Sequence, residues 1–158
     1  MSNVINVVAA GLGGQGVLKI TDILAEVVFR SGYDVKKSEV HGMSQRGGSV
    51  SSEVRYGSRV ASPMVPAGEA DYLVVIDPTQ VEVVRGKLKD GGVLITTEDI
   101  PVDKLENPRA VNTMLLGALA AKLGLDDQLW QDVLKKEFGP QLYDLNARMF
   151  KLGFDSAK

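Results

Sequence analysis

The fold is decided by residues 4–16, which read VINVVAAGLGGQG. Residues 4–10 are apolar, rich in β-branched side chains and hardly alternate in polarity, which predicts a strand covered on both faces. Residues 11–16 interrupt that run with glycines, and the apolar residues of 17–30 are spaced as on one face of a helix. A strand, a glycine loop and a helix in this order predict the opening of a Rossmann-like α/β fold.

The glycine loop matches a phosphate-binding pattern, because Gly11, Gly13 and Gly16 fit G-x-G-x-x-G between a strand and a helix. Glycine permits the tight turn and the close approach of backbone to ligand, and free N–H groups at a helix start attract anions. Three interpretations stay open: contact with a phosphate or other anion, classical NAD binding, or a purely structural crossover. NAD binding also requires an acidic residue that ends the second strand, for which Glu39 is the best-placed candidate.

The remainder of the chain alternates strands with helices. The expected elements are strands at 35–40, 49–56, 59–65, 72–76 and 93–96, and helices at 79–89, 114–123, 126–138 and from Pro140 onward. Strand 49–56 alternates in polarity, which predicts one solvated face, and 59–65 is expected to return beside it as a hairpin. The sequence therefore predicts one domain over residues 1–158, with an α/β, Rossmann-like, mostly parallel sheet, helices on both faces, a β-hairpin insertion and a helical C-terminus.

Composition excludes several kinds of site. The chain has no cysteine and one histidine, which excludes a cysteine-ligated iron–sulfur cluster, a disulfide framework and a multi-histidine metal site. A formal net charge of −2 without a basic stripe argues against a nucleic-acid partner. No apolar run has the length of a membrane span, and the first residues lack the pattern of a signal peptide, so we expect a cytoplasmic protein with no membrane partner.

The most unusual polar segment is residues 38–49, which read SEVHGMSQRGGS. Loops beyond the carboxyl ends of strands form the ligand crevice of an open α/β sheet, so this segment is expected beside the glycine loop. His41 is either a proton donor or acceptor near neutral pH or a hydrogen-bonded structural residue. Arg46 either grips a phosphate or carboxylate in a forked geometry or pairs with Glu39 or Glu53.

Three further polar residues lie next to predicted helix starts. Asp77 ends a strand on the crevice side and is either a helix cap or a ligand contact. Asn112 and Thr113 precede a helix and are expected to cap it. No structure is predicted for residues 98–109.

Two long runs carry a resemblance to a known family. They are GLGGQGVLKITDILAEVVFRSGYDVKKSEVHGMSQRGGSVSSEVRYG at 11–57 and AVNTMLLGALAAKLGL at 110–125, and NARMF at 146–150 with Gly153 adds to them. These runs resemble the gamma-type domain of 2-oxoacid:ferredoxin oxidoreductases, in the pyruvate/ketoisovalerate oxidoreductase family. Within that family, the stretch SEVHGMSQRGGSV is similar to the beta subunits of indolepyruvate:ferredoxin oxidoreductases.

The resemblance implies a subunit that supports coenzyme A-dependent oxidative decarboxylation of a 2-oxoacid, with indolepyruvate or another aryl pyruvate favoured. It implies a large partner subunit that carries thiamine diphosphate and iron–sulfur clusters and reduces ferredoxin. This chain alone is then expected to be inactive, with no cofactor of its own and no assigned catalytic residue. Glu39 and His41 are expected to face the crevice or the partner. The candidate cofactor contacts are Gly11, Gly13, Gly14, Gln15, Gly16, Ser44, Gln45 and Arg46.

Members of the family are usually longer before the segment that contains Asn112, so a partner contact made by residues 98–109 is not expected to carry over. An isolated subunit with an exposed docking face is expected to form a homodimer. Two rival functions stay open: a stand-alone nucleotide- or coenzyme A-binding Rossmann-like module, and an NAD(P)-dependent dehydrogenase. The sequence names neither the 2-oxoacid nor the stoichiometry of the complex.

Overall fold

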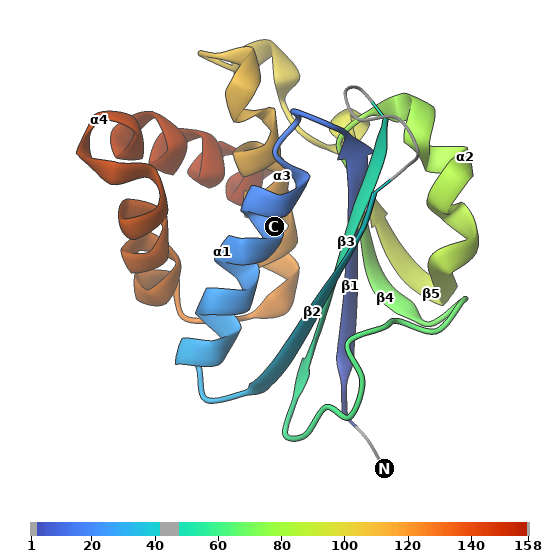
Figure 1. The fold of residues 1–158 in the computed structure, drawn as a ribbon. Helices are drawn as coiled ribbons and strands as arrows, with labels where there is room; N and C mark the ends of the chain where they lie inside the picture. Colours follow the sequence, from blue (N-terminus) through green and yellow to red (C-terminus); the bar gives the residue numbers. More distant parts are fainter. Residues whose placement is uncertain (1–2, 42–47, 158) are drawn as a thin grey trace.

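A computed structural model describes residues 3–41 and 48–157 of the chain. It contains one five-stranded sheet with helices on both faces (Figure 1). The strands are β1 (Ile5–Leu12), β2 (Asp34–His41), β3 (Ser49–Gly57), β4 (Ala70–Val75) and β5 (Leu88–Ile95). The α-helices are α1 (Val17–Arg30), α2 (Val81–Val84), α3 (Val111–Leu123) and α4 (Asp127–Ser156). Short 3-10 turns lie at Pro78–Gln80, Arg85–Lys87, Thr97–Asp99, Val102–Lys104 and Pro108–Ala110.

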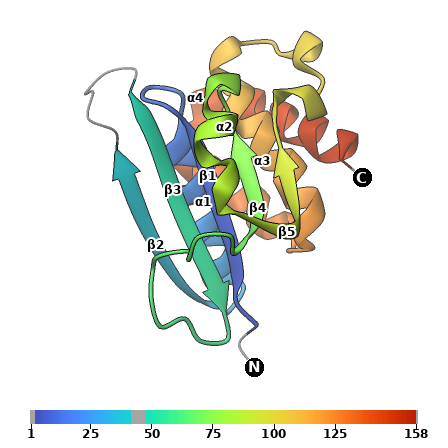
Figure 2. The same cartoon turned by 90° about the vertical axis from the view of Figure 1, so that its right-hand side faces the viewer.

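The sheet has the strand order β2-β3-β1-β4-β5 (Figure 2). β1 pairs in parallel with β4, and β4 with β5, whereas β3 is antiparallel to both β1 and β2. Four strands therefore run in one direction, which confirms the predicted mostly parallel α/β sheet. The carboxyl ends of those four strands and the start of β3 share one edge, where ligand crevices form in open α/β sheets.

The hairpin insertion is present, but its partner strand was predicted wrongly. β3 pairs along its length with β2, and residues 58–69 contain no strand. The expected return at 59–65 fails because β3 already has hydrogen-bonding partners on both sides. Pro63 and Pro66 also lack the N–H groups that a further strand would need.

The predicted solvated face of β3 is buried. Ser51 is 8% exposed and Glu53 is 3% exposed. Glu53 accepts hydrogen bonds from the Val65 backbone N–H (2.8 Å) and from Lys87 Nζ (2.9 Å). The alternation of polar and apolar residues predicted a solvent-exposed face, but the loop after β3 folds back over that face. The Glu53 carboxylate is therefore satisfied by the protein itself.

The two faces of the sheet are covered by different helices (Figure 1). Helices α1, α3 and α4 pack on one face, where the largest fully buried side chains include Trp130 and Phe150 at a ring separation of 5.4 Å. A smaller apolar cluster that contains Val65 and Val84 covers the other face beside α2. Among the described residues, no helix is both long and apolar enough to cross a membrane.

Local features of the sequence predicted most helices correctly. α1 covers the predicted range, and α4 is broken at Gly139 (φ 73°) before Pro140, so the two predicted C-terminal helices are confirmed. Asp126 caps α4 by accepting a hydrogen bond from the Gln128 N–H. The helix predicted at 79–89 is wrong in its extent, because α2 is a single turn flanked by 3-10 turns and β5 already begins at Leu88.

Candidate functional site

The glycine loop links the end of β1 to the start of α1. Gly14 (φ 90°) and Gly16 (φ 84°) both adopt the left-handed conformation that side chains disfavour. The Gly13 N–H donates to the Gly48 carbonyl over 2.9 Å, which fixes the loop against the start of β3. Gly11, in contrast, is a buried strand residue, and a Cβ there would lie 2.9 Å from Gln15 Oε1. Gly14 is therefore the glycine most available to a ligand, while Gly11 serves close packing.

Gln15 points inward and braces the loop. Its Oε1 accepts a hydrogen bond from the Leu12 N–H over 2.7 Å, and its Nε2 donates to Asp77 Oδ2 over 2.8 Å. Asp77 Oδ1 accepts two more hydrogen bonds, from the hydroxyl (2.6 Å) and the N–H (3.0 Å) of Thr79. Asp77 is thus the predicted cap of the following turn and also the anchor of the glycine loop. Contact of Gln15 with a ligand stays a prediction.

Hydrogen bonds to Asp77 favour its charged form. The Thr79 hydroxyl has the largest effect, followed by the Thr79 N–H and Gln15, and together they lower the pKa of Asp77 below its usual value. The carboxylate therefore remains ionised at neutral pH and can hold both neighbouring segments.

A cavity of about 540 Å³ opens beside the glycine loop and is bounded on its far side by the start of α3. Its lining includes Gly14, Gly16, Arg109 and Asn112. Neither α1 nor α3 has an acidic residue in its first turn or a side-chain cap. Two helix N-termini therefore contribute positive potential to the same cavity. Such a cavity suits an anion.

Among the described residues, Arg109 is the only arginine or lysine that lines this cavity. It is exposed, and within residues 3–41 and 48–157 it makes no ion pair. Sequence reasoning missed it because residues 98–109 had no predicted structure. The available signal was Asn107-Pro108, since Asn is a good cap and Pro suits the first helical position. Asn107 does accept a hydrogen bond from the Arg109 N–H (2.9 Å).

The expectation that Asn112 and Thr113 cap α3 is wrong. Asn112 Nδ2 donates to the Gly16 carbonyl over 3.3 Å, which joins α3 to the glycine loop. Thr113 is buried and donates to Asn146 Oδ1 over 2.8 Å. Both side chains point across to other elements because the 3-10 turn Pro108–Ala110 already leads into the helix.

Residues 96–110, which precede α3, form a short segment that is held in place by side-chain hydrogen bonds. Thr96 and Asp99 form a capping box at its start, with Asp99 Oδ2 accepting from the Thr96 N–H over 2.8 Å. Glu106 binds the Arg148 guanidinium through two hydrogen bonds of 2.8 and 2.9 Å. The hydrogen bond from Arg148 lowers the pKa of Glu106, so the pair stays charged at neutral pH. This forked contact holds the segment that carries Arg109 against α4.

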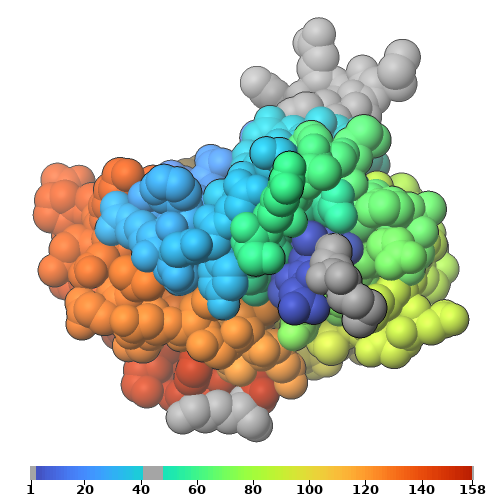
Figure 3. Space-filling model, turned by 90° about the horizontal axis from the view of Figure 1, so that it is seen from below, coloured from blue at the N-terminus to red at the C-terminus, as the bar shows by residue number. Residues whose placement is uncertain are grey.

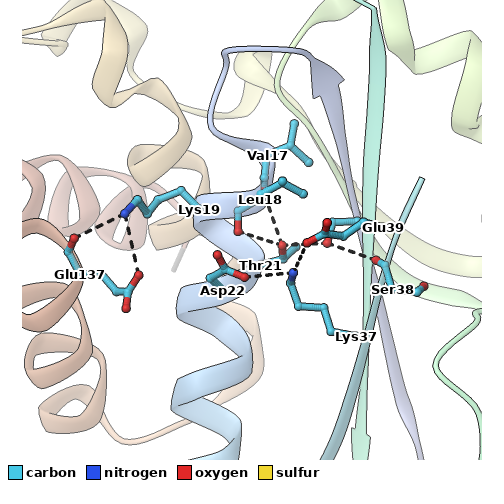
Figure 4. A network of polar contacts seen from close by, with 10 residues as sticks. Val17, Leu18, Lys19, Thr21, Asp22, Lys37, Ser38, Glu39 and Glu137 are labelled. Atoms are coloured by element: carbon cyan, nitrogen blue, oxygen red, sulfur yellow. Dashed lines mark hydrogen bonds and ion pairs between the residues drawn. The ribbon is translucent and has the colours of Figure 1, made fainter. Parts of the chain in front are cut away.

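A second polar network lies on the other side of α1, at the end of β2 (Figure 4). Lys37 Nζ contacts Asp22 Oδ1 at 3.0 Å and Glu39 Oε2 at 2.6 Å. Burial opposes the charged amine, but the hydrogen bonds to Glu39 and Asp22 outweigh it and raise the pKa of Lys37. Thr21 Oγ1 donates to Ser52 Oγ over 2.8 Å and ties α1 to β3. The network joins α1 to β2 and β3.

The remaining candidates fall in or next to a segment that the structure does not describe. Ser44, Gln45 and Arg46 lie outside the described residues, as does the side chain of His41, whose backbone ends β2 opposite Val50. Their contacts with a cofactor or partner stay predictions. The described ends of this segment, His41 and Gly48, do lie at the same sheet edge as the glycine loop, as the sequence predicted.

On the far side of α1, Lys19 lines a smaller cavity of about 340 Å³ that shares Gly14 and Gly16. Its Nζ lies 3.8 Å from Glu137 Oε1 and 5.4 Å from the centre of the Phe138 ring. Figure 4 shows Lys19 directed toward Glu137. Lys19 is thus paired within the fold, whereas Arg109 faces the larger cavity without such a partner among the described residues.

Similar folds occur among solved oxidoreductase structures. A keto/oxoacid ferredoxin oxidoreductase gamma subunit from Geobacter sulfurreducens superposes with a TM-score of 0.82 over 97% of this chain and 98% of that chain, at 23% identity. A 2-oxoglutarate:ferredoxin oxidoreductase from Magnetococcus marinus matches with a TM-score of 0.86 over 99% of this chain but 31% of that chain, at 20% identity. The fold therefore occurs both as a separate subunit and within a longer chain.

Sequence relatives extend the likeness along the whole chain. The indolepyruvate oxidoreductase subunit IorB of Thermococcus kodakarensis is 32% identical over 97% of this chain and 96% of that protein. The alignment spans 193 positions, more than the 158 residues of this chain, so it contains gaps on this side. The ketoisovalerate oxidoreductase subunit VorA of Methanothermobacter marburgensis is 30% identical over 98% of this chain and 37% of that protein.

The family model for pyruvate ferredoxin/flavodoxin oxidoreductase matches residues 6–104 and 98–156. The two matches overlap at residues 98–104, within the short segment before α3, which agrees with the expectation that the chain is trimmed there. Taken with the glycine loop and the sheet order, the match along the whole chain shows that this chain belongs to the pyruvate ferredoxin/flavodoxin oxidoreductase family.

Proposed function

We propose that this chain is the small, gamma-type subunit of a cytoplasmic 2-oxoacid:ferredoxin oxidoreductase. A larger subunit would carry thiamine diphosphate and the iron–sulfur clusters, since this chain has no cysteine to ligate a cluster. Indolepyruvate or another aryl pyruvate is the favoured substrate, because the IorB likeness covers nearly all of both chains. The chain alone is expected to have no turnover.

The glycine-loop cavity is the proposed contribution of this subunit to coenzyme A binding. One observation carries this step: Arg109, which has no ion-pair partner among the described residues, and the N-termini of α1 and α3 face one cavity. Gly14 leaves open space where a side chain would stand, so a phosphate could approach the backbone. These residues fit a phosphate group by charge and by N–H donors.

Coenzyme A, when bound, supplies the thiol that accepts the acyl group. The residues of this chain would then hold and orient a phosphate of that cofactor. Arg109 would form charge-assisted hydrogen bonds to phosphate oxygens, while the backbone N–H groups of Gly14 and Gly16 would donate to the same group; the Gln15 N–H already donates to the Leu12 carbonyl. Ser44, Gln45 and Arg46, which lie outside the described residues, remain candidates for the same role because the sequence predicts them beside the glycine loop.

The sheet order argues against the NAD-dependent alternative. In a dinucleotide fold the acidic residue on the ribose ends the strand next to β1. Here β3 lies between β1 and β2, so Glu39 stands about 10 Å away from β1 at the usual strand spacing. Glu39 also binds Lys37, which neutralises the carboxylate that the ribose would need.

The test combines co-purification with steady-state kinetics. The tagged chain is purified from its native cells, and a large thiamine-binding partner is expected to co-elute. In the complex, Arg109→Gln should raise the KM for coenzyme A about tenfold, since a charged hydrogen bond contributes about 1.5–3 kcal/mol. The KM for the 2-oxoacid should not change.

Arg59→Gln is the matched control, because Arg59 is exposed on the loop after β3, at the opposite edge of the sheet. It should leave both KM values unchanged. If Arg109→Gln behaves like this control, the cavity does not hold coenzyme A, although the subunit assignment survives. If the chain elutes alone at every salt concentration, the subunit assignment itself is wrong.

A further inference from the structure

A second cavity, of about 330 Å³, lies at the opposite edge of the sheet from the glycine loop. It sits where the amino ends of β1 and β4 meet the end of β3 and the end of α3. Figure 3 views this edge from below, with the N-terminal strand in blue beside the orange α3–α4 connection. The side chains that define it are Ile5, Tyr33, Tyr56, Tyr72, Leu123 and Leu125.

The tyrosines give the cavity aromatic walls. The rings of Tyr33 and Tyr56 lie edge to face, with centroids 5.3 Å apart and an interplanar angle of 61°. Tyr56 is opposite Ile5 in the β1–β3 register, while Tyr72 is opposite Val7 on the other side of β1. The rings therefore come from three separate elements and are positioned by the backbone of the sheet.

The tyrosine hydroxyl groups have no hydrogen-bond partner in the described part of the protein. Among residues 3–41 and 48–157, no hydrogen bond is made by the hydroxyl of Tyr33, Tyr56 or Tyr72. Tyr56 is only 4% exposed as a residue, but its hydroxyl oxygen is not among the buried side-chain atoms that lack a partner, so this oxygen reaches solvent. Because Tyr56 lines the cavity, its hydroxyl is available to donate a hydrogen bond to an acceptor on a bound molecule.

The hydroxyl of Tyr56 is held in its protonated state. Burial raises the pKa of Tyr56 well above the usual tyrosine value, and the neighbouring Tyr72 and Tyr33 raise it further. The group can therefore donate a hydrogen bond throughout the physiological pH range. None of the described residues that line the cavity carries a charge, so the cavity offers no counter-ion to a charged ligand.

We propose that this tyrosine cavity binds a small, neutral, planar aromatic molecule that carries a hydrogen-bond acceptor such as a carbonyl oxygen. Its volume is at the lower end of the range of about 300–1,000 Å³ for small-molecule pockets, which fits one or two fused rings. Aromatic walls favour a ring as occupant through edge-to-face and stacked contacts. The site is independent of the proposed coenzyme A contact, because the two cavities lie at opposite edges of the sheet.

The test uses indole-3-carboxaldehyde as the probe and the full chain as the protein. Saturation-transfer NMR and calorimetry should show saturable binding of this probe. Cyclohexanecarboxaldehyde, which keeps the carbonyl but lacks the aromatic ring, should bind much more weakly. Tyr56→Phe should weaken the affinity for the aromatic aldehyde about three- to tenfold, as expected for the loss of one hydrogen bond.

Stability separates a ligand site from a structural role. Tyr56→Phe should leave the thermal midpoint of the free chain unchanged, since no described residue bonds to the Tyr56 hydroxyl and its oxygen reaches solvent. Tyr143→Phe is the matched control, because its hydroxyl is on α4 and binds Gln131 Oε1 at 2.9 Å, outside the cavity. It should lower the midpoint and leave the affinity unchanged. The proposal is overturned if no saturable binding occurs at millimolar concentrations, or if the triple variant of Tyr33, Tyr56 and Tyr72 to Phe binds the probe as the native chain does.

Discussion

The side-chain amide of Gln15 donates a hydrogen bond to the carboxylate of Asp77 over 2.8 Å, although the two residues are 62 positions apart in the chain. This contact joins the glycine loop after β1 to the turn after β4. Parallel strands end at the same edge of the sheet, so residues that follow them are brought together. The shape of the candidate anion cavity thus depends on a pairing that neither segment displays alone.

Replacing Asp77 should lower stability in a pH-dependent way. Its pKa is lowered in the folded chain, so its stabilising effect is complete above the unfolded-state pKa of about 3.9 and is lost as the pH falls through the folded value. Asp77→Ala should reduce the free energy of unfolding by about 1–2 kcal/mol near neutral pH, as for loss of a cap. Urea titrations near neutral pH and in acid measure the difference, which should shrink in acid. Asp90→Ala, at an exposed position in β5, is the control and should change the free energy of unfolding by less than about 0.5 kcal/mol.

Two glycines of the loop should tolerate alanine differently. Both have a positive φ, but a Cβ on Gly16 would overlap the amide of Asn112, whereas Gly14 has open space around it. Gly14→Ala should destabilise the chain by about 1–2 kcal/mol through backbone conformation alone. Gly16→Ala should destabilise it further, and Asn112→Ala added to it should recover part of the loss. Equal effects of the two alanines in chemical denaturation would contradict this geometry.

Close packing between α3 and α4 should make two other glycines sensitive. A Cβ on Gly117 would overlap the Phe150 carbonyl, and one on Gly153 would overlap the Met114 carbonyl. Because backbone atoms cannot move aside cheaply, either alanine variant should lose at least about 3 kcal/mol or fail to fold. Gly86→Ala has open space and should be neutral or slightly stabilising. Thermal melts of the three variants make the comparison, and a native-like midpoint for Gly117→Ala is the result that the packing rules out.

Substitutions of the two hydroxyl residues Thr21 in α1 and Ser52 in β3 should have coupled effects on the free energy of unfolding. Thr21 and Ser52 are both buried, and Thr21 Oγ1 donates to Ser52 Oγ over 2.8 Å. Thr21→Val should destabilise the chain by about 1–2 kcal/mol, because it leaves a buried hydroxyl with fewer partners. Thr21→Val combined with Ser52→Ala should cost less than the sum of the single changes. A double-mutant cycle measures this, and strict additivity would mean that the hydrogen bond contributes nothing.

Several features of the fold could be predicted from the sequence because their causes are local. The apolar spacing of α1 sets its face and length, Gly32 follows its end, and Gly139 before Pro140 breaks the C-terminal helix. The glycine loop between β1 and α1 likewise follows from its own residues. The segments that resemble oxidoreductase subunits gave the family correctly.

Other features were decided only by the tertiary structure. The position of β3 between β1 and β2, the burial of Glu53 against Lys87 and the approach of Arg109 to the glycine loop all join residues distant in the chain. Strand alternation reports which residues share a face, but not whether another segment covers that face. Pairing order depends on free energies summed over distant contacts, and it leaves no periodic signal in either strand. For this reason the sequence alone determined the elements and the family, while the sheet order determined which residues form the site.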